Sequence, residues 1–315
     1  MRVLGYDATV AALEFSPLVE ALRQAFRKTD FETPSADLHS LAVPGEATGS
    51  LIVLPAWLPG KNFGVRLTTN FPGNAARNKP VRGGGYLLGD GKTGEILAMF
   101  DGPALTLRRT AAASALAATY LARAESERML MMGTGALASH LIAAHASVRP
   151  IHSVLIWGRD PGKAARLAQR MTRRNLKVEA AQDLEQAVHG ADIICCATSA
   201  REPILKGAWL PDGVHVDLVG GRTPQMREAD DEVMVRSRIF VDVREAAEQQ
   251  AGDIVQPLAS GAITSFDITG DLFELTRGDR AGRRFHNQIT LFKSVGYALE
   301  DLTGAQVALD NSVNG

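Results

Sequence analysis

The chain has 315 residues, of which 45% are hydrophobic and 22% are charged, and its formal net charge is -1. This length suits two domains of ordinary size, each with its own core. The nearly balanced charge gives no reason to expect nucleic acid or an acidic membrane as a partner. No apolar run approaches the roughly 20 residues of a membrane span, and the first residues lack the apolar core of a signal peptide. We therefore expect a globular protein of the cytoplasm.

The first part of the chain predicts a helix followed by strands. Ser16 and Pro17 have the pattern of an N-cap and a first-turn proline at the start of an amphipathic run. Apolar runs predict strands at residues 49–57, 63–71, 84–90 and 94–102. A glycine-rich turn joins the last two runs as a hairpin. These segments indicate a mostly antiparallel sheet with a helix.

The second part alternates between strands and helices after an alanine-rich helix at 106–124. Strands are predicted at residues 128–133, 153–158, 177–181, 192–199, 214–220 and 238–243. Apolar strands separated by helices imply parallel pairing with both faces covered, which is the α/β doubly wound sheet. The last stretch, 286–315, predicts one long amphipathic helix. We place the doubly wound domain at 111–285, and a smaller α+β domain at 1–110 that the C-terminal helix completes.

The first strand of the doubly wound domain runs into a loop with Gly133 and Gly135, and a helix pattern resumes at Ala136 and Leu137. The first glycine allows a tight turn, and the second lets the backbone approach a pyrophosphate. Ala138 fills the third position, where a small residue lets helix and strand pack closely. The helix N-terminus offers unpaired N–H groups and a partial positive charge. The loop predicts a dinucleotide-binding domain of the Rossmann type, against the alternative of a connecting turn without a ligand.

The second strand of this domain ends at Gly158, and Arg159 and Asp160 follow it directly. Lys163 lies one helical turn further on. An acidic residue directly at the strand end would accept bonds from the ribose 2′-hydroxyl and repel a 2′-phosphate. A guanidinium can instead grip a phosphate with two bonds. We therefore favour NADP(H) as the cofactor, with NAD(H) as the alternative. In the competing interpretation Arg159 is a solvated turn residue and Asp160 caps the next helix.

Thr198 and Val219 each lie at the C-terminal end of a predicted strand, at the edge where a dinucleotide crosses a parallel sheet. We expect both near the cofactor, and the alternative is that both are ordinary loop residues. Cys195 and Cys196 are neighbours in one strand, so they point to opposite faces and are expected to be buried free thiols. The chain shows no zinc-ligand spacing and no nucleophile elbow, so neither a metal site nor hydrolase chemistry is predicted.

Several phrases together resemble the ornithine cyclodeaminase/mu-crystallin family. They are GVRLTTNFPGN, LLGDGKTGEILAMFDGPALTLRRTAAASALAATYLAR, the GTGALA loop and ITLFKSVGYALEDL. The likeness covers most of the chain from about Gly49 onward. The family includes ornithine and lysine cyclodeaminases, an alanine dehydrogenase and reductases of cyclic ketimines such as Δ1-pyrroline-2-carboxylate. The resemblance implies a Rossmann domain beside a smaller substrate domain that also makes a homodimer.

The resemblance also implies roles for single residues. Family members hold the substrate carboxylate with cations of the substrate domain, and Arg109 matches the arginine that precedes Thr-Ala/Gly-Ala. Arg66 stands where most members have lysine, and its charge suits a carboxylate although its pKa makes it a poor proton donor. Ser294, with Lys293, matches a motif that we place at the start of the last helix, near the cofactor. The alternatives are a structural salt bridge for Arg109 and helix packing for Ser294.

Two departures from the family concern the substrate. Where many members carry an arginine after the first proline of the substrate domain, this chain has Ala36, Asp37 and His39. Arg222 occupies the place of an aspartate that, in ornithine cyclodeaminases, handles protons on the substrate amine. The second departure argues against ornithine cyclodeamination.

The sequence thus predicts NAD(P)H-dependent reduction of a small, cyclic imino acid by a homodimer. Three alternatives stay open: an amino-acid cyclodeaminase, an alanine dehydrogenase that uses NAD, and a non-catalytic NADPH-binding protein of the mu-crystallin type.

Overall fold

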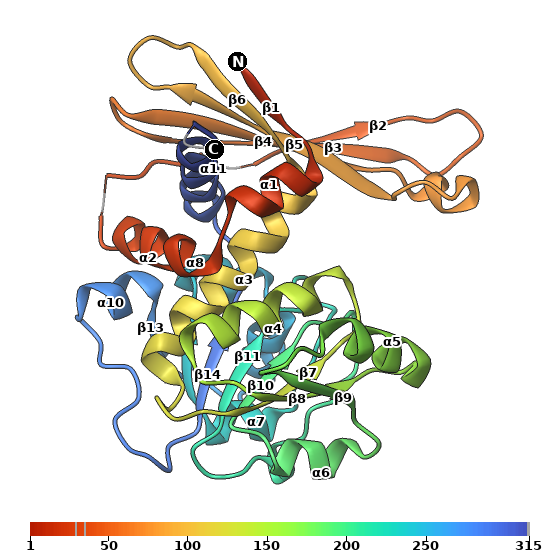
Figure 1. Cartoon of the computed structure of the whole chain (residues 1–315), viewed down its shortest axis with the longest axis vertical. Coiled ribbons are helices and arrows are strands. Elements are labelled where there is room, and N and C mark those ends of the chain that lie inside the picture. The colour runs from red at the N-terminus through yellow and green to blue at the C-terminus, as the bar shows by residue number, and fades with distance from the viewer. Residues whose placement is uncertain (29, 35, 314–315) are drawn as a thin grey trace. The chain divides into compact units, whose positions relative to one another are not determined.

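The computed structural model describes residues 1–28, 30–34 and 36–313, and the chain divides into two compact units. Unit 1 consists of Met1–Arg109 and Tyr297–Gly315, and unit 2 consists of Thr110–Gly296. Each unit is built on its own sheet (Figure 1). Within the described ranges, no helix is both long and apolar enough to cross a membrane.

Unit 1 contains a six-stranded sheet with the order β1-β6-β5-β4-β3-β2. Neighbouring strands are antiparallel except β1 and β6, which are parallel. The expected antiparallel sheet and the hairpin of β5 and β6 are therefore confirmed. The strands are β1 (Arg2–Leu4), β2 (Asp37–Leu41), β3 (Gly49–Leu58), β4 (Asn62–Asn70), β5 (Arg82–Asp90) and β6 (Ile96–Asp101).

The helices of unit 1 follow from apolar faces that pack together or against this sheet. They are α1 (Tyr6–Ala12), α2 (Phe15–Phe26), the 3-10 helix η1 (Pro72–Arg77) and α11 (Ala298–Val313); the long α3 (Gly102–Leu121) contains the boundary between the units. The N-cap residue of α2 is Glu14, so Ser16 lies inside the first turn and is not the N-cap as predicted, whereas Pro17 lies in the first turn as expected.

One face of the sheet in unit 1 is covered by α11, which packs against β3, β4 and β5. The cross-strand neighbours Ala56, Gly64 and Leu88 on that face are all buried. A Cβ at Gly64 would lie 2.0 Å from the hydroxyl of Tyr86, so glycine makes room for that ring. Arg66 is two residues from Gly64 and points to the same face. The strand alternation therefore carries a cation onto the covered face.

Unit 2 contains eight strands, all parallel, in the order β13-β12-β14-β11-β10-β7-β8-β9. The order runs outward in both directions from the pair β7 and β10, which is the doubly wound arrangement. The predicted α/β fold class is therefore confirmed. The strands are β7 (Arg128–Met132), β8 (Ser153–Trp157), β9 (Lys177–Ala180), β10 (Ile193–Cys196), β11 (His215–Leu218), β12 (Arg238–Val241), β13 (Ile268–Asp271) and β14 (Thr290–Lys293).

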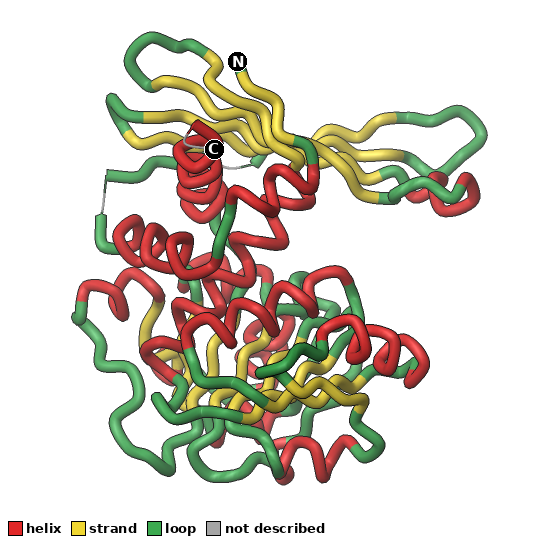
Figure 2. The backbone as a smooth tube through the Cα atoms, viewed as in Figure 1, coloured by secondary structure: helices red, strands yellow, loops and turns green. Residues whose placement is uncertain are grey.

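Helices flank the strands of unit 2 (Figure 2). Their apolar faces, with those of the strands, form a continuous core around residues such as Leu130, Ile194 and Val216. The helices are α4 (Ala136–Val148), α5 (Pro161–Met171), α6 (Leu184–His189), α7 (Asp231–Arg236), α8 (Arg244–Gln250), α9 (Gly252–Ser260) and α10 (Leu272–Arg277), with the 3-10 helices η2 (Gly207–Trp209) and η3 (Ser265–Asp267).

The C-terminal stretch differs from the helix predicted over 286–315. Thr290–Lys293 form β14, which pairs with β11 and β12 inside the sheet of unit 2. Leu291 and Phe292 of this strand are fully buried. The helix α11 begins only at Ala298. The prediction was wrong up to that residue, because a short apolar strand directly before a helix shares its apolar spacing and only pairing in space distinguishes them.

Candidate active site

A cleft opens in unit 2 where β7, β8 and β10 end. Its volume is about 860 Å³, which lies in the range of cofactor pockets. Open parallel sheets bind ligands at this edge, where the strand order changes direction. Six residues predicted from the sequence to bind the cofactor line this cleft: Gly133, Gly135, Arg159, Asp160, Lys163 and Thr198.

The glycine loop after β7 has the backbone that a phosphate cradle needs. Gly133 has a φ of 124°, and a Cβ there would lie 2.5 Å from the carbonyl oxygen of Ala197. Gly135 is the N-cap residue of α4, and a Cβ there would meet nothing within 4 Å. Its Cα therefore faces open space, and Ala136 and Leu137 form the first helical turn beside it. Backbone N–H groups of such a turn attract phosphate, so these residues fit a dinucleotide pyrophosphate.

The charged residues after β8 form an exposed rim of the cleft. Arg159, Asp160 and Lys163 are all exposed and line it. Asp160 is the N-cap residue of α5, and its Oδ1 accepts a hydrogen bond from the backbone N–H of Lys163 at 3.0 Å. The carboxylate therefore caps the helix, which is one of the roles that the sequence left open. Arg159 and Lys163 supply positive charge to the same rim.

Thr198 is held at the cleft by a buried carboxylate that sequence analysis missed. Oε1 of Glu228 accepts hydrogen bonds from the backbone N–H of Thr198 at 2.6 Å and from its hydroxyl at 2.8 Å. Burial, opposed by Lys293 and aided by Asp253, raises the pKa of Glu228 to about 7. Burial therefore favours the protonated form of Glu228 more than it would at the surface. The run READDEV offers no local signal that distinguishes this buried acid from the less buried acids that follow it.

The chain after β11 and β14 is more buried than expected. Val219 is 4% exposed and Ser294 is 1% exposed, and neither is among the described residues that line the cleft. The hydroxyl of Ser294 donates to Oδ2 of Asp242 at 3.2 Å. Lys293 ends a strand and does not begin the last helix, and its Nζ lies 3.3 Å from Oδ2 of Asp253. The structure thus places Ser294 at a strand end and corrects its predicted place in a helix.

In unit 1, Arg66 of β4 is held by three side chains. Its Nε donates to Oγ1 of Thr68 at 3.3 Å, its Nη1 to Oδ2 of Asp301 at 3.0 Å, and its Nη2 to Oγ1 of Thr106 at 3.1 Å. The side chain is 25% exposed. A guanidinium has five N–H donors. These bonds therefore leave two donors on a partly open side chain.

Arg109 lies inside α3, which begins at Gly102, whereas the helix predicted over 106–124 placed it in the first turn. Its side chain is 5% exposed, and it donates from Nε to Oδ1 of Asp301 at 2.9 Å and from Nη1 to Oε2 of Glu300 at 2.6 Å. Burial opposes the charge, but the two carboxylates raise the pKa of Arg109 above its ordinary value. Arg109 therefore forms the salt bridges that were the structural alternative for it. Its Nη2 carries two further N–H donors.

Three further polar residues differ in their burial. Arg108 is half-buried: its Nε donates to the carbonyl of Leu13 at 2.7 Å, and its guanidinium carbon lies 3.5 Å from the ring centre of Phe15. The second contact is a cation–π interaction. His39 in β2 and Arg222 after β11 are exposed.

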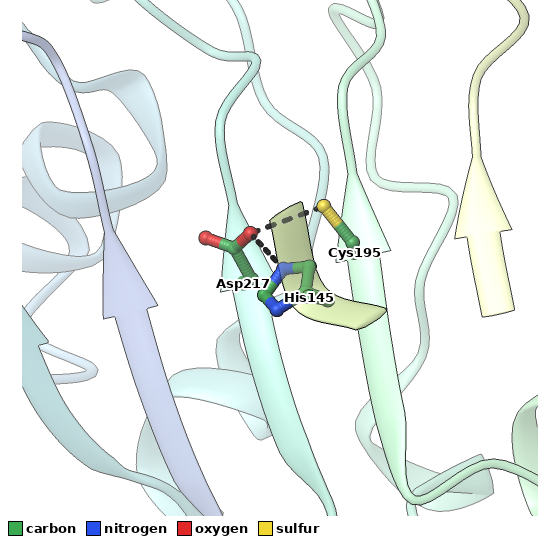
Figure 3. A group of neighbouring side chains, drawn as sticks. All are labelled: His145, Cys195 and Asp217. Carbon is green, nitrogen blue, oxygen red and sulfur yellow. Dashed lines mark hydrogen bonds and ion pairs between the residues drawn. The ribbon is translucent and has the colours of Figure 1, made fainter. Parts of the chain in front are cut away.

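A histidine, a cysteine and an aspartate meet inside unit 2 (Figure 3). The candidate ligand atoms of His145, Cys195 and Asp217 lie within 4.8 Å of one another, and zinc takes such donors. Oδ2 of Asp217 lies 3.1 Å from both His145 Nε2 and Cys195 Sγ, and Ser114 donates to its Oδ1 at 3.1 Å. Burial raises the pKa of the Cys195 thiol far above its ordinary value, which disfavours the thiolate that a metal needs. The cluster is a hydrogen-bonded network around a buried carboxylate.

Sequence analysis missed this network because its members come from α3, α4, β10 and β11. The two cysteines were predicted more successfully. Cys195 and Cys196 are both buried and free of disulfides, as expected.

Comparison with known proteins agrees with the fold. The model of the ornithine cyclodeaminase/mu-crystallin family matches residues 6–315. The chain belongs to this family. The resemblance inferred from the sequence motifs is therefore confirmed, and it extends over nearly the whole chain.

Within the family, the chain is similar to a Δ1-pyrroline-2-carboxylate reductase of Paracoccus denitrificans. The two are 39% identical over 302 residues, which cover 96% of this chain and 94% of the relative. A solved structure of the Thermococcus litoralis Δ1-pyrroline-2-carboxylate reductase, in complex with NADH and L-proline, is 30% identical, with a TM-score of 0.91 and coverage of 100% of this chain and 98% of that one. An archaeal alanine dehydrogenase dimer with bound NAD is 27% identical, with a TM-score of 0.89 and coverage of 100% and 96%.

Proposed function

We propose that the protein is an NAD(P)H-dependent reductase of a small imino acid, with the cyclic Δ1-pyrroline-2-carboxylate as its representative substrate. One observation carries the proposal. Unit 2 has a cleft that suits a dinucleotide, and unit 1 of the same chain has two arginines with N–H donors to spare. Two relatives that cover almost the whole chain bear the name of this reductase. One of them was solved with L-proline, which is the reduced form of that imine.

The roles of this chain's residues follow from their chemistry. The bound nicotinamide dinucleotide supplies the hydride. The glycine loop and the first turn of α4 hold its pyrophosphate. Arg66 and Arg109 bind the substrate carboxylate through charge-assisted hydrogen bonds, each worth about 1.5–3 kcal/mol, and so orient the imine carbon. Arg66 orients the substrate through its charge and its N–H donors. A cyclic imine that arrives protonated needs no acid from the protein.

The test is an assay of NADPH and NADH oxidation with Δ1-pyrroline-2-carboxylate and with linear imino acids. We expect oxidation that depends on the imine, with L-proline as the product of the cyclic substrate. Release of ammonia from L-ornithine would instead identify a cyclodeaminase, and reduction of NAD by L-alanine would identify an alanine dehydrogenase. Cofactor binding without turnover of any imine would identify a binding protein.

We further propose that the cleft favours NADP(H). Arg159 and Lys163 bring two positive charges to the rim, and the opposing carboxylate of Asp160 is engaged as a helix cap. The net attraction for a 2′-phosphate in a partly wet site is about 1–3 kcal/mol, or roughly ten- to a hundredfold in affinity. The solved relatives contain NADH or NAD, so a comparison of both cofactors on this chain is needed.

NADPH is expected to bind at least about tenfold more tightly than NADH. Arg159→Ala should remove most of that margin and change the affinity for NADH little, because only the 2′-phosphate requires the extra charge. Titration of nucleotide fluorescence measures both constants. Arg170→Ala, an exposed arginine of the same helix, is the control and should keep the preference. Equal affinities for NADPH and NADH in the parent protein would mean that Asp160 accepts hydrogen bonds from the ribose hydroxyls and that the cleft binds NAD(H).

We also propose that the protein is a homodimer formed through unit 1. An apolar row crosses five strands of its sheet on the face opposite Arg66, in the order Pro55, Val65, Leu87, Met99 and Val3. Met99 is 38% exposed and Val3 is 70% exposed, and a continuous apolar face of this kind favours association. The related alanine dehydrogenase is described as a dimer.

The dimer is expected in light scattering at micromolar concentration. Val65→Asp should produce monomers, because it places a charge in the middle of the apolar row. Arg128→Asp, at an exposed position in unit 2, should leave the dimer intact. A monomeric parent protein would remove this part of the proposal.

A further inference from the structure

One aspartate joins the two arginines of unit 1. Asp301, in the first turn of α11, is 2% exposed, and its Oδ1 binds Arg109 while its Oδ2 binds Arg66, at 2.9 Å and 3.0 Å. Arg109 also binds Glu300 at 2.6 Å. Burial would raise the pKa of Asp301, but Arg109 and Arg66 together hold it below its ordinary value. The four side chains therefore form a single network of ion pairs.

The charges of this network cancel. Arg66 and Arg109 contribute two positive charges, and Glu300 and Asp301 contribute two negative charges. Apart from Arg66, these side chains are at most 5% exposed, so water and salt screen their charges little. A ligand that reaches Arg66 therefore meets spare N–H donors in a cluster without net positive charge.

We propose that Asp301 is the positioning residue of the substrate arginines and that the balanced charge selects imino acids with one carboxylate over those with two. This inference rests on the proposed function. An imino acid with one carboxylate and a protonated nitrogen is a zwitterion, so it adds no net charge to the network. A second carboxylate adds a negative charge that no cation of the network neutralises, close to two buried carboxylates that repel it.

Asp301 positions the arginines because its two oxygens hold one nitrogen of each. Arg66 is also bound by Thr68 and Thr106, so its guanidinium is fixed on all three nitrogens before a ligand arrives. A donor group fixed in advance loses less conformational freedom when it binds. Glu300 forms an ion pair with Arg109. The two carboxylates therefore share the role in charge, and Asp301, which joins both arginines, has the role in orientation.

The test is calorimetric titration of the protein, saturated with NADP⁺, with L-proline and L-aspartate. These probes carry one and two carboxylates and need no turnover. The parent protein is expected to bind L-proline at least about tenfold more tightly than L-aspartate. Glu300→Gln adds one positive charge and leaves the bond between Asp301 and Arg66 intact. It should therefore raise the affinity for L-aspartate and change that for L-proline by no more than about threefold.

Asp301→Asn adds the same charge but presents an amide N–H₂ to one of the arginines. It should reduce the ratio of the affinity for L-proline to that for L-aspartate. It should also weaken L-proline binding by about tenfold or more, because Arg66 loses its ion pair with Asp301. A purely structural role would lower both affinities together with the melting temperature. Glu95→Gln, at an exposed position between β5 and β6, changes the net charge equally and should leave the ratio unchanged.

Equal affinities in the parent protein, a ratio that neither variant alters, or no binding of either ligand would overturn the inference. If Asp301→Asn does not fold, Glu300→Gln alone tests whether charge balance selects the ligand. Asp301→Glu keeps the charge and moves the carboxylate by one methylene, so it tests whether Asp301 positions the arginines. The reductase proposal is judged separately by imine-dependent NADPH oxidation. A preference for L-proline without such oxidation would reject the reductase and keep the selectivity.

Discussion

Replacing Gly135 with valine is expected to abolish binding of NADPH and NADH while the protein stays folded. Gly135 has a φ of -75° and ψ of 177°, which any residue adopts, and a Cβ there meets nothing within 4 Å. The added side chain therefore projects into the cleft, at the N-terminus of α4 where the pyrophosphate must approach the backbone. We expect a loss of at least about a hundredfold in affinity, equivalent to roughly 2.8 kcal/mol.

Fluorescence titration of both dinucleotides measures this loss, and thermal unfolding without cofactor measures the cost to the fold. Gly135→Ala should give a smaller loss, because it adds a single methyl group to the same place. Gly133→Ala is the contrasting variant: its φ of 124° and its approach to Ala197 mean that a side chain strains the loop itself. Normal dinucleotide binding by Gly135→Val would show that the loop does not hold phosphate.

Features set by local patterns were predictable from the sequence. The hairpin of β5 and β6 follows from a glycine-rich turn between apolar runs, and the place of Gly133 follows from the order of strand, glycine and helix. Asp160 was correctly considered as a helix cap because capping involves residues three positions apart. Each of these features depends on a few neighbouring residues, so the chain itself carries the information.

Contacts between distant parts of the chain were not predictable in this way. Asp301 lies 235 residues from Arg66 and 192 residues from Arg109, and in the run ALEDL it resembles any acid on the outer face of a helix. Glu228 beneath Thr198 and the strand β14 were missed for the same reason. One signal was available: Arg66 lies between apolar residues of a strand, and Arg109 lies in an alanine-rich helix. Cations in such places need buried counter-charges.

Arg109→Ala is expected to have the largest effect on the fold. The substitution leaves the carboxylates of Glu300 and Asp301 buried, with Arg66 as the cation that still binds Asp301. Removing one partner of a buried pair costs about 3–5 kcal/mol, a large part of the 5–15 kcal/mol that stabilises an ordinary protein. The expected result is a marked fall in melting temperature, measured by calorimetry. Arg108→Ala, at the preceding position of α3, loses hydrogen bonds at a half-buried site and should lower the melting temperature less.

Because loss of stability would obscure a role in binding, a compensated variant separates the two. Arg109→Met combined with Glu300→Gln removes one charge of each sign and leaves the pair of Arg66 and Asp301 intact. Neutral replacement of a buried ion pair is often harmless to stability, so this variant should recover most of the melting temperature. It lacks the donors on Nη2 of Arg109, so its KM for an imino acid should rise and its kcat/KM should fall by about tenfold or more. Recovery of both stability and kcat/KM would assign Arg109 a structural role alone and leave Arg66 as the carboxylate ligand of unit 1.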